Sequence, residues 1–262
     1  MSSIITLTTD FGLQDHYVGA MKAVMLGINP NARLVDISHD VPPQDIMAGA
    51  WILRNSAMLF PPNTVHLVVV DPGVGTDRNP VAVHVEDQYF VGPDNGIFSL
   101  IGEDFDLKAV RINNSSLWRK EQSDTFHGRD IFAPVAANLA GETPFEDLGE
   151  PISELVSYKW AIPISDRDGI QGWVVHIDRF GNLVTNISAS LIRESSIASN
   201  FKIYVGNAIL KNIEKTFSSV ADGEPVAYIG SSGNLEIAIN KGNAREMLDV
   251  KKGAQVSIIT QK

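Results

Sequence analysis

Acidic and basic side chains gather at the ends of apolar segments in the first half of the chain. The apolar run 65–70 is rich in β-branched residues, which is typical of a buried strand, and it ends at Asp71 in a glycine-containing turn. Arg78 follows within reach of that turn, and the run 4–8 ends in a similar turn that contains Asp10. Because α/β sheets bind ligands beyond the carboxyl ends of their strands, these side chains are candidate site residues.

Further polar groups occur later in the chain. Phe126-His127-Gly128 places an aromatic ring beside an imidazole, and polar turns follow at 178–182 and 231–236. Small molecules often bind where two domains or layers meet. The residues alone therefore predict a small-molecule site without identifying the molecule.

A metal site is one alternative for these residues. Asp10, His16, His39 and Asp40 follow strand segments and are of the types that ligate metals. The chain has no cysteine, which excludes disulfides, thiolate zinc sites, iron–sulfur clusters and cysteine nucleophiles. Gly73-Val74-Gly75 lacks the third glycine and the helix that a dinucleotide-binding loop needs.

The composition is that of a globular protein with a sizeable core. The 262 residues include 44% hydrophobic and 20% charged residues, and the net charge is −10. That charge argues against nucleic acid or an anionic membrane surface as partner. Neither an apolar run of about 20 residues nor a secretory signal is evident, so we expect a cytoplasmic location.

The order of elements predicts two domains. Strand-like and helix-like segments alternate in the first half, which favours an α/β domain with a doubly wound, mainly parallel sheet. From Gly172 onward, short alternating segments separated by turns predict a small all-β domain, an antiparallel barrel or a sandwich, of which we expect the barrel. A polar stretch around Ser165 sets the predicted domains at 1–165 and 166–262.

Several motifs, in one order over nearly the whole chain, resemble those of the S-adenosyl-L-methionine (SAM) hydroxide adenosyltransferases. These enzymes are also called SAM hydrolases and are related to the SAM-dependent fluorinase and chlorinase. The motifs are Thr9-Asp10-Phe11-Gly12, Val70-Asp71-Pro72-Gly73-Val74-Gly75 with Arg78, Gly92-Pro93-Asp94-Asn95-Gly96, Phe126-His127-Gly128-Arg129-Asp130, Phe180-Gly181-Asn182 with Thr185-Asn186-Ile187, and Ser231-Ser232-Gly233 with Leu235-Glu236.

The resemblance implies a function and an assembly. The family hydrolyses SAM to adenosine and L-methionine, and some members prefer the non-physiological epimer at sulfur. It needs no metal or redox cofactor. Its fold is an N-terminal α/β domain and a C-terminal β-barrel, assembled as a homotrimer whose sites lie between the N-terminal domain of one subunit and the C-terminal domain of its neighbour.

The resemblance also assigns residue roles. Asp71, Arg78 and His127 match the family's Asp-Arg-His set and would hold the attacking water. The implied substrate contacts are Asp10 to the ribose hydroxyls, Phe126 to the nucleoside, Phe180 and Asn182 to adenine, Asp178, Ser231 and Glu236 to the methionine end, and the backbone near Ile239 to adenine.

One position departs from the related halogenases. Those enzymes carry a hydroxylic residue where this chain has Gly128, so water is the expected nucleophile rather than a halide. Two other functions stay open from the sequence: a non-catalytic adenosine or SAM sensor, and a metal-dependent hydrolase built on Asp10 and the nearby histidines.

Overall fold

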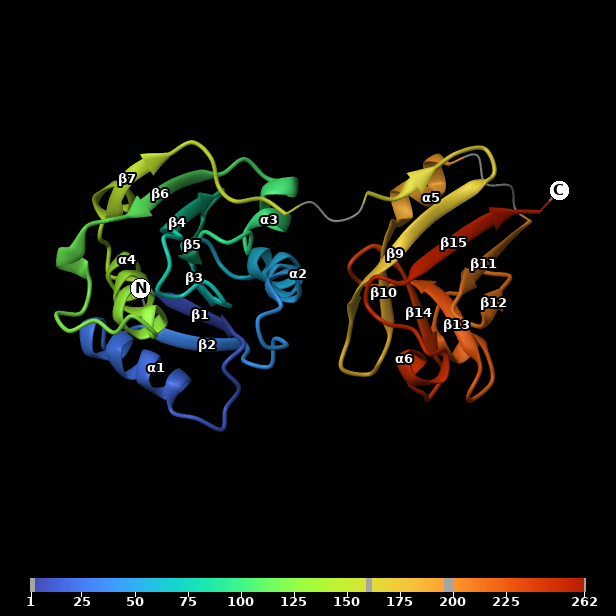
Figure 1. The fold of residues 1–262 in the computed structure, drawn as a ribbon, viewed down its shortest axis with the longest axis horizontal. Helices are drawn as coiled ribbons and strands as arrows, with labels where there is room; N and C mark the ends of the chain where they lie inside the picture. Colours follow the sequence, from blue (N-terminus) through green and yellow to red (C-terminus); the bar gives the residue numbers. More distant parts are fainter. Residues whose placement is uncertain (1–2, 159–161, 196–199, 262) are drawn as a thin grey trace. The chain divides into compact units, whose positions relative to one another are not determined.

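The computed structural model describes residues 3–158, 162–195 and 200–261 (Figure 1). Its contacts divide the chain into a first unit, residues 1–158, and a second unit, residues 159–262. The division falls earlier than the predicted boundary at 165/166. The reason is that β8 (Ile164–Ser165) already pairs with β9 (Gly169–Ile177) of the second unit.

The first unit contains a seven-stranded mixed sheet in the order β2-β1-β3-β5-β4-β6-β7. The pairs β1–β2, β1–β3 and β3–β5 are parallel, and the pairs β4–β5, β4–β6 and β6–β7 are antiparallel. The strands are β1 (Ile4–Thr9), β2 (Arg33–Ser38), β3 (Val65–Val69), β4 (Pro80–Val85), β5 (Gln88–Pro93), β6 (Lys108–Ile112) and β7 (Gly149–Ile152).

The prediction of a mainly parallel sheet therefore describes only four of these seven strands. Two residues, Glu86 and Asp87, join β4 to β5, and so short a connection permits only antiparallel pairing. Parallel neighbours need a longer crossover, which α1 (Tyr17–Ile28) and α2 (Ile46–Ser56) supply for β2, β1 and β3.

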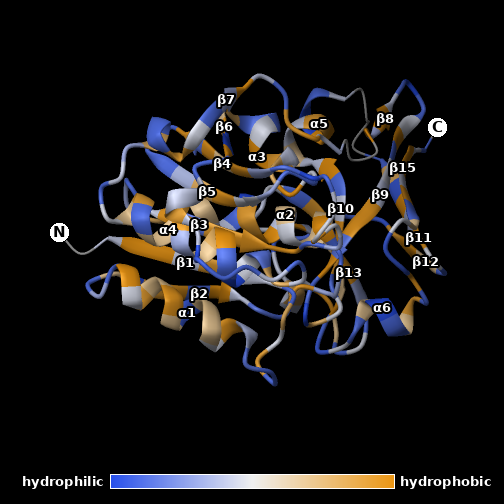
Figure 2. Cartoon of the chain, turned by 60° about the vertical axis from the view of Figure 1, so that its left-hand side comes forward, coloured by the Kyte–Doolittle hydropathy of each residue, from blue (hydrophilic) through white to orange (hydrophobic). Residues whose placement is uncertain are grey.

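Two apolar clusters cover the two faces of this sheet. Leu67 and Val69 belong to the cluster that includes side chains of α1 and α4 (Ala133–Ala140). Val68 and Val70 belong to the cluster that includes α2 and α3 (Ser99–Asp104). Alternate residues of β3 thus face opposite cores, which explains why the strand reads as a continuous apolar run. Figure 2 shows hydrophobic segments along the strands.

The second unit contains an eight-stranded antiparallel sheet in the order β12-β11-β15-β9-β10-β14-β13, with β8 beside β9. The terminal strands β12 and β13 are in contact, so the sheet is nearly barrel-shaped around its own apolar cluster. The remaining elements are β10 (Leu183–Ser188), β11 (Phe201–Val205), β12 (Ala208–Leu210), β13 (Pro225–Ile229), β14 (Asn234–Ile239), β15 (Gln255–Thr260), α5 (Ala189–Glu194) and α6 (Ala244–Met247).

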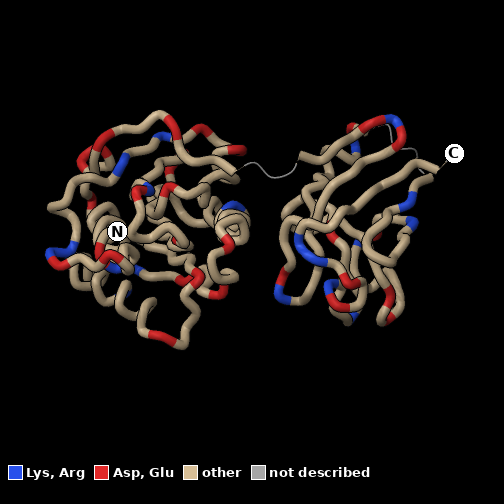
Figure 3. Tube along the Cα trace, viewed as in Figure 1, with Lys and Arg blue, Asp and Glu red and all other residues tan. Residues whose placement is uncertain are grey.

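Acidic residues are spread along the chain in both units, in keeping with the net charge (Figure 3). Among the described residues, every helix is too short or too polar to cross a bilayer.

Candidate active site

Asp71, Arg78 and His127 form one connected cluster in the first unit. The Arg78 Nε lies 3.0 Å from Oδ1 of Asp71, and Nη2 lies 2.6 Å from Oδ2. The same Nη2 lies 2.9 Å from Nδ1 of His127. The side chains of Arg78 and Asp71 are only 9% and 5% exposed. The guanidinium therefore links a carboxylate to an imidazole in a largely dry place.

The contact with Arg78 determines the tautomer of His127. A guanidinium can only donate hydrogen bonds, so Nδ1 must accept and the ring proton lies on Nε2. Burial lowers the pKa of His127 below its usual value of 6.5, and the positive charge of Arg78 lowers it further. His127 is thus a neutral imidazole whose Nε2–H can donate to a ligand.

Close packing of two loops brings these residues together. Gly75 has a φ of +77°, and a Cβ there would lie 2.7 Å from the carbonyl oxygen of Asp124. Only glycine fits both the backbone conformation and that approach. The turn that holds Asp71 and Arg78 can therefore pack against the loop that ends at His127, and the Arg78 guanidinium lies 5.1 Å from the ring centroid of Phe132.

Asp130 fixes the other side of this loop. It is fully buried within a π-helical turn, Gly128–Phe132, that begins directly after His127. Its carboxylate accepts hydrogen bonds from Arg119 at 2.7 Å, from Arg129 at 2.7 and 2.8 Å, and from the backbone N–H of Ser123 at 2.9 Å. Burial alone would raise the pKa of Asp130, but these donors lower it. This role of Asp130 was not predicted from the sequence.

Asp10 follows the end of β1 and is only partly exposed. Its Oδ2 accepts a hydrogen bond from the backbone N–H of Gln44 at 2.8 Å, which ties the turn after β1 to the loop after β2. The other oxygen has no partner among the described residues, so Asp10 can accept from a ligand.

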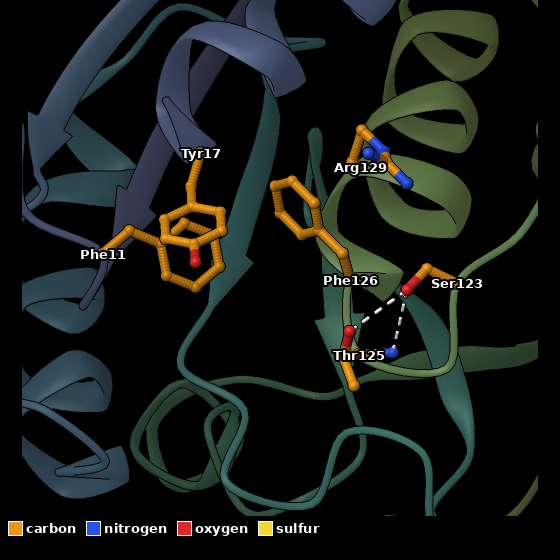
Figure 4. Close-up of a pocket in the computed structure, with 6 residues that line it drawn as sticks. All are labelled: Phe11, Tyr17, Ser123, Thr125, Phe126 and Arg129. Carbon is orange, nitrogen blue, oxygen red and sulfur yellow. Dashed lines mark hydrogen bonds between the residues drawn. The ribbon is translucent and has the colours of Figure 1, made fainter. Parts of the chain in front are cut away.

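A pocket of about 360 Å³ opens beside Phe126 (Figure 4). The Phe126 ring packs edge-on against Tyr17 at 5.2 Å and Phe11 at 6.0 Å, and the Arg129 guanidinium lies 5.0 Å from it. Ser123 and Thr125 complete the lining. Aromatic walls with a few polar groups suit a small molecule. The rings of Phe11 and Tyr17 were not predicted as site residues, although both follow the carboxyl end of a strand.

The turn between β9 and β10 contains Asp178, Phe180 and Asn182. Asp178 Oδ1 accepts from the backbone N–H groups of Phe180 at 2.9 Å and Asn182 at 2.8 Å, and Oδ2 accepts from the Asn182 side chain at 2.8 Å. Asn182 is buried, whereas Phe180 is 75% exposed. Asp178 therefore shapes the turn that presents an aromatic ring to solvent.

The neighbouring hairpin of the second unit holds the other predicted residues. β10 and β14 pair with Val184 opposite Glu236, so the two turns belong to adjacent strands. Ser231 is exposed in the β13–β14 turn. The Ile239 side chain lies in the core, on the opposite face of β14 from Glu236, and its carbonyl accepts from Gly242.

The alternative metal site does not form among the described residues. They contain no group of three or more His, Asp or Glu side chains that could hold a metal ion. His39 instead contacts Thr9 through Nδ1 at 2.8 Å and Asp36 through Nε2 at 3.1 Å.

Comparisons with known proteins identify the family of this chain. Residues 5–149 match the SAM hydroxide adenosyltransferase N-terminal domain, and residues 172–257 match the C-terminal domain. A protein of Thermus thermophilus named (R)-S-adenosyl-L-methionine hydrolase is 38% identical, covering 96% of this chain and 97% of that one. A Methanocaldococcus jannaschii protein of the same name is 37% identical, covering 98% and 95%.

More distant relatives and solved structures extend the comparison. A fluorinase of an Actinoplanes species is 26% identical, covering 97% of each chain. The crystal structure of an uncharacterized conserved protein from Thermotoga maritima has a TM-score of 0.91 at 39% identity, covering 97% of this chain and 99% of that one. Since the two domain matches span most of the sequence, the chain belongs to the family of SAM hydroxide adenosyltransferases.

Proposed function

We propose that this protein hydrolyses S-adenosyl-L-methionine to adenosine and L-methionine, and that it prefers the epimer with the R configuration at sulfur. The observation that carries the reaction is the Arg78 guanidinium, which contacts both Asp71 and His127 in a nearly buried cluster. The relatives named (R)-S-adenosyl-L-methionine hydrolase, at 34–38% identity, support the substrate and its epimer.

The reaction is a displacement at C5′ of the ribose. The water oxygen forms a bond to C5′ as the bond from C5′ to sulfur breaks. The electron pair of that bond leaves with sulfur, which becomes the neutral thioether of methionine, and the water gives up one proton. Because the leaving group is neutral, it needs no general acid. A water held in line with the bond from C5′ to sulfur lowers the activation barrier. Exclusion of other water from the site reduces the screening of the reacting charges.

The three cluster residues have complementary roles in this scheme. The positive charge of Arg78 stabilises the hydroxide character that develops on the water oxygen. The Nε2–H of His127 donates to that oxygen and orients it, because Nδ1 is already occupied by Arg78. Asp71 is the group that takes the proton, since a carboxylate has about four acceptor positions and Arg78 occupies three.

The remaining predicted residues are proposed to bind the substrate. Asp10 accepts from the ribose hydroxyls through its open oxygen, and Phe126 packs against the nucleoside. The turn with Phe180 and Asn182 receives adenine, together with the backbone near Ile239. Asp178, Ser231 and Glu236 bind the methionine end, because an α-ammonium favours carboxylate partners.

The assembly is a proposal from the family resemblance. We infer a homotrimer in which the first unit of one subunit and the second unit of its neighbour supply one site. Such a head-to-tail interface closes into a ring under threefold symmetry. It accounts for the presence of polar site residues on both units and for an exposed Phe180 ring.

Incubation with each sulfur epimer of SAM, followed by chromatography, tests the function. We expect adenosine and methionine in equal amounts, faster from the R epimer, with the rate retained after exhaustive chelation. Arg78→Ala should lower turnover by at least about 100-fold. The matched control is Arg54→Ala, which removes an arginine from a partly exposed ion pair with Asp104 and should leave the rate unchanged.

Three results would contradict the proposal. Tight SAM binding without product would indicate a sensor, and activity abolished by chelation would indicate a metal-dependent hydrolase. Full activity of the Arg78→Ala variant would remove the proposed role of the cluster.

A further inference from the structure

A short hydrogen bond constrains Glu236 in the second unit. The hydroxyl of Tyr228 donates to Oε2 of Glu236 at 2.6 Å, and the two residues face each other across β13 and β14. Tyr228 is only 7% exposed. A Cβ on Gly230 would collide with the Glu236 carboxylate, so the backbone leaves that space to the carboxylate alone. Glu236 is thus held from two sides.

This hydrogen bond keeps one direction. Burial raises the pKa of Tyr228 well above its usual value, and the negative charges of Glu236 and Asp178 raise it further. The phenol is therefore protonated at neutral pH and is the donor. Oε2 of Glu236 accepts this hydrogen bond, so Tyr228 sets the position of the Glu236 carboxyl group.

Strand pairing places Asp178 and Glu236 in the same region of the second unit. Val184 of β10 pairs with Glu236 of β14 and with His176 of β9, and Asp178 follows His176 by two residues. Burial raises the pKa of Glu236, and the charge of Asp178 raises it further. In the described part of the second unit, neither carboxylate forms an ion pair with a lysine or arginine. Two adjacent carboxylates without a cation repel each other, so binding a cationic ligand group there is favoured.

We propose that Tyr228 is a positioning residue for the substrate: its hydroxyl holds Glu236 beside Asp178 so that the two carboxylates receive the α-ammonium of the methionine half. This inference rests on the proposed function and extends it to Tyr228, which lies outside the family motifs given above. The aromatic neighbour Phe217 packs on Tyr228 at 4.6 Å between ring centroids and helps to hold the phenol in place.

The proposal predicts an effect confined to one half of the substrate. Tyr228→Phe removes a hydrogen bond to a charged group, so the KM for SAM should rise by about tenfold. Turnover at saturation should change little, because Tyr228 does not touch the reacting atoms. The inhibition constant of adenosine, which lacks the methionine half, should stay unchanged. The inhibition constant of L-methionine should rise with the KM.

The experiment compares Tyr228→Phe with a matched control and a double variant. Tyr204→Phe removes the same hydroxyl from another strand of the second unit, β11, and should alter none of these constants. Glu236→Gln should reproduce the rise in KM. The double variant should be no worse than Glu236→Gln alone, since Tyr228 acts only through Glu236. Melting temperatures of all variants verify folding.

The outcomes separate the inference from the proposed function. An unchanged KM in Tyr228→Phe, equal changes for adenosine and methionine, or additive effects in the double variant would each overturn the role of Tyr228 while leaving SAM hydrolysis intact. If the wild-type protein forms no adenosine from either epimer, the proposed function fails, and the inference fails with it.

Discussion

At the scale of single residues, the proposed chemistry depends on Arg78, because it contacts both other members of the cluster. Its planar fork reaches Asp71 through two nitrogens and His127 through one of them. A point charge on a flexible stem cannot make these contacts together. In the proposed mechanism, the shape of the guanidinium therefore contributes to catalysis beyond its charge.

Arg78→Lys tests that statement. The variant keeps a positive charge but loses the fork, so we expect turnover to fall on the order of 100-fold while the KM changes less than about threefold. Steady-state kinetics on the R epimer measure both constants. A lysine variant with wild-type turnover would show that charge alone suffices.

The pH dependence of turnover tests the protonation state of His127. Burial and Arg78 lower the pKa of this imidazole, so the neutral form dominates at pH 7. As pH falls through the lowered pKa, the ring gains a proton on Nδ1 and can no longer accept from Arg78. Turnover at saturating substrate should therefore decline only below pH 6.5. An acid limb centred above 6.5 would contradict this assignment.

The sequence predicted part of this residue set. Asp71, Arg78 and Asp10 follow strand ends, so local pattern alone selected them as candidates. His127 lies 49 residues from Arg78, and only the family resemblance connected the two. Asp130 stands in one of the family motifs, but its role and that of Tyr228 were not predicted. Both roles depend on contacts with Arg119, Arg129 and Glu236 that no periodicity encodes.

At the scale of elements, two turns create the cluster. The turn after β3 carries Asp71 and Arg78, and the loop before the π-helical turn carries His127. Most strands were predicted from apolar runs and turn signals. Their order was not, since β5 lies between β3 and β4 in the sheet. Strand order depends on long-range pairing rather than local sequence.

Gly75→Ala tests the packing of the two turns. The change places a Cβ against the carbonyl of Asp124 at a positive φ, so it should destabilise the fold and separate Arg78 from His127. The matched control is Gly223→Ala, where φ is +83° and the space is open. The control should cost about 1 kcal/mol from backbone strain alone, and Gly75→Ala should cost more.

Denaturant unfolding gives the stability of both glycine variants, and steady-state kinetics give their turnover. Turnover should fall only in Gly75→Ala. Equal stabilities and equal turnover in the two variants would show that the turn tolerates a side chain and does not set the cluster geometry.

At the scale of the whole molecule, the chain consists of two units with separate apolar cores. The change from alternating helices and strands to short antiparallel strands predicted this division. The exact boundary depended on the pairing of β8, a two-residue strand that no pattern reveals. Proposed site residues lie on both units, so the complete site depends on how units associate.

Co-expression of two inactive variants tests the proposed trimer. Arg78→Ala inactivates the first unit, and a double change of Asp178 and Asn182 to alanine impairs binding by the second. Each shared site needs an intact first unit from one subunit and an intact second unit from its neighbour. Each of these units is intact in half of the subunits, so random mixing restores about one quarter of the sites. Separately purified variants, mixed without exchange, serve as the control.

A lack of restored activity in verified mixed oligomers would place both halves of the site in one subunit. A monomer by analytical ultracentrifugation would also contradict the shared site.

The most direct test of the central claim is single-turnover hydrolysis of the R epimer in water labelled with ¹⁸O. We expect the 5′ oxygen of adenosine to carry the label in the wild-type reaction. We also expect Arg78→Ala to bind SAM with a similar Kd but to form labelled adenosine at least about 100-fold more slowly. Unlabelled adenosine, or a variant as fast as the wild type, would contradict a water held by Asp71, Arg78 and His127 and attacking C5′.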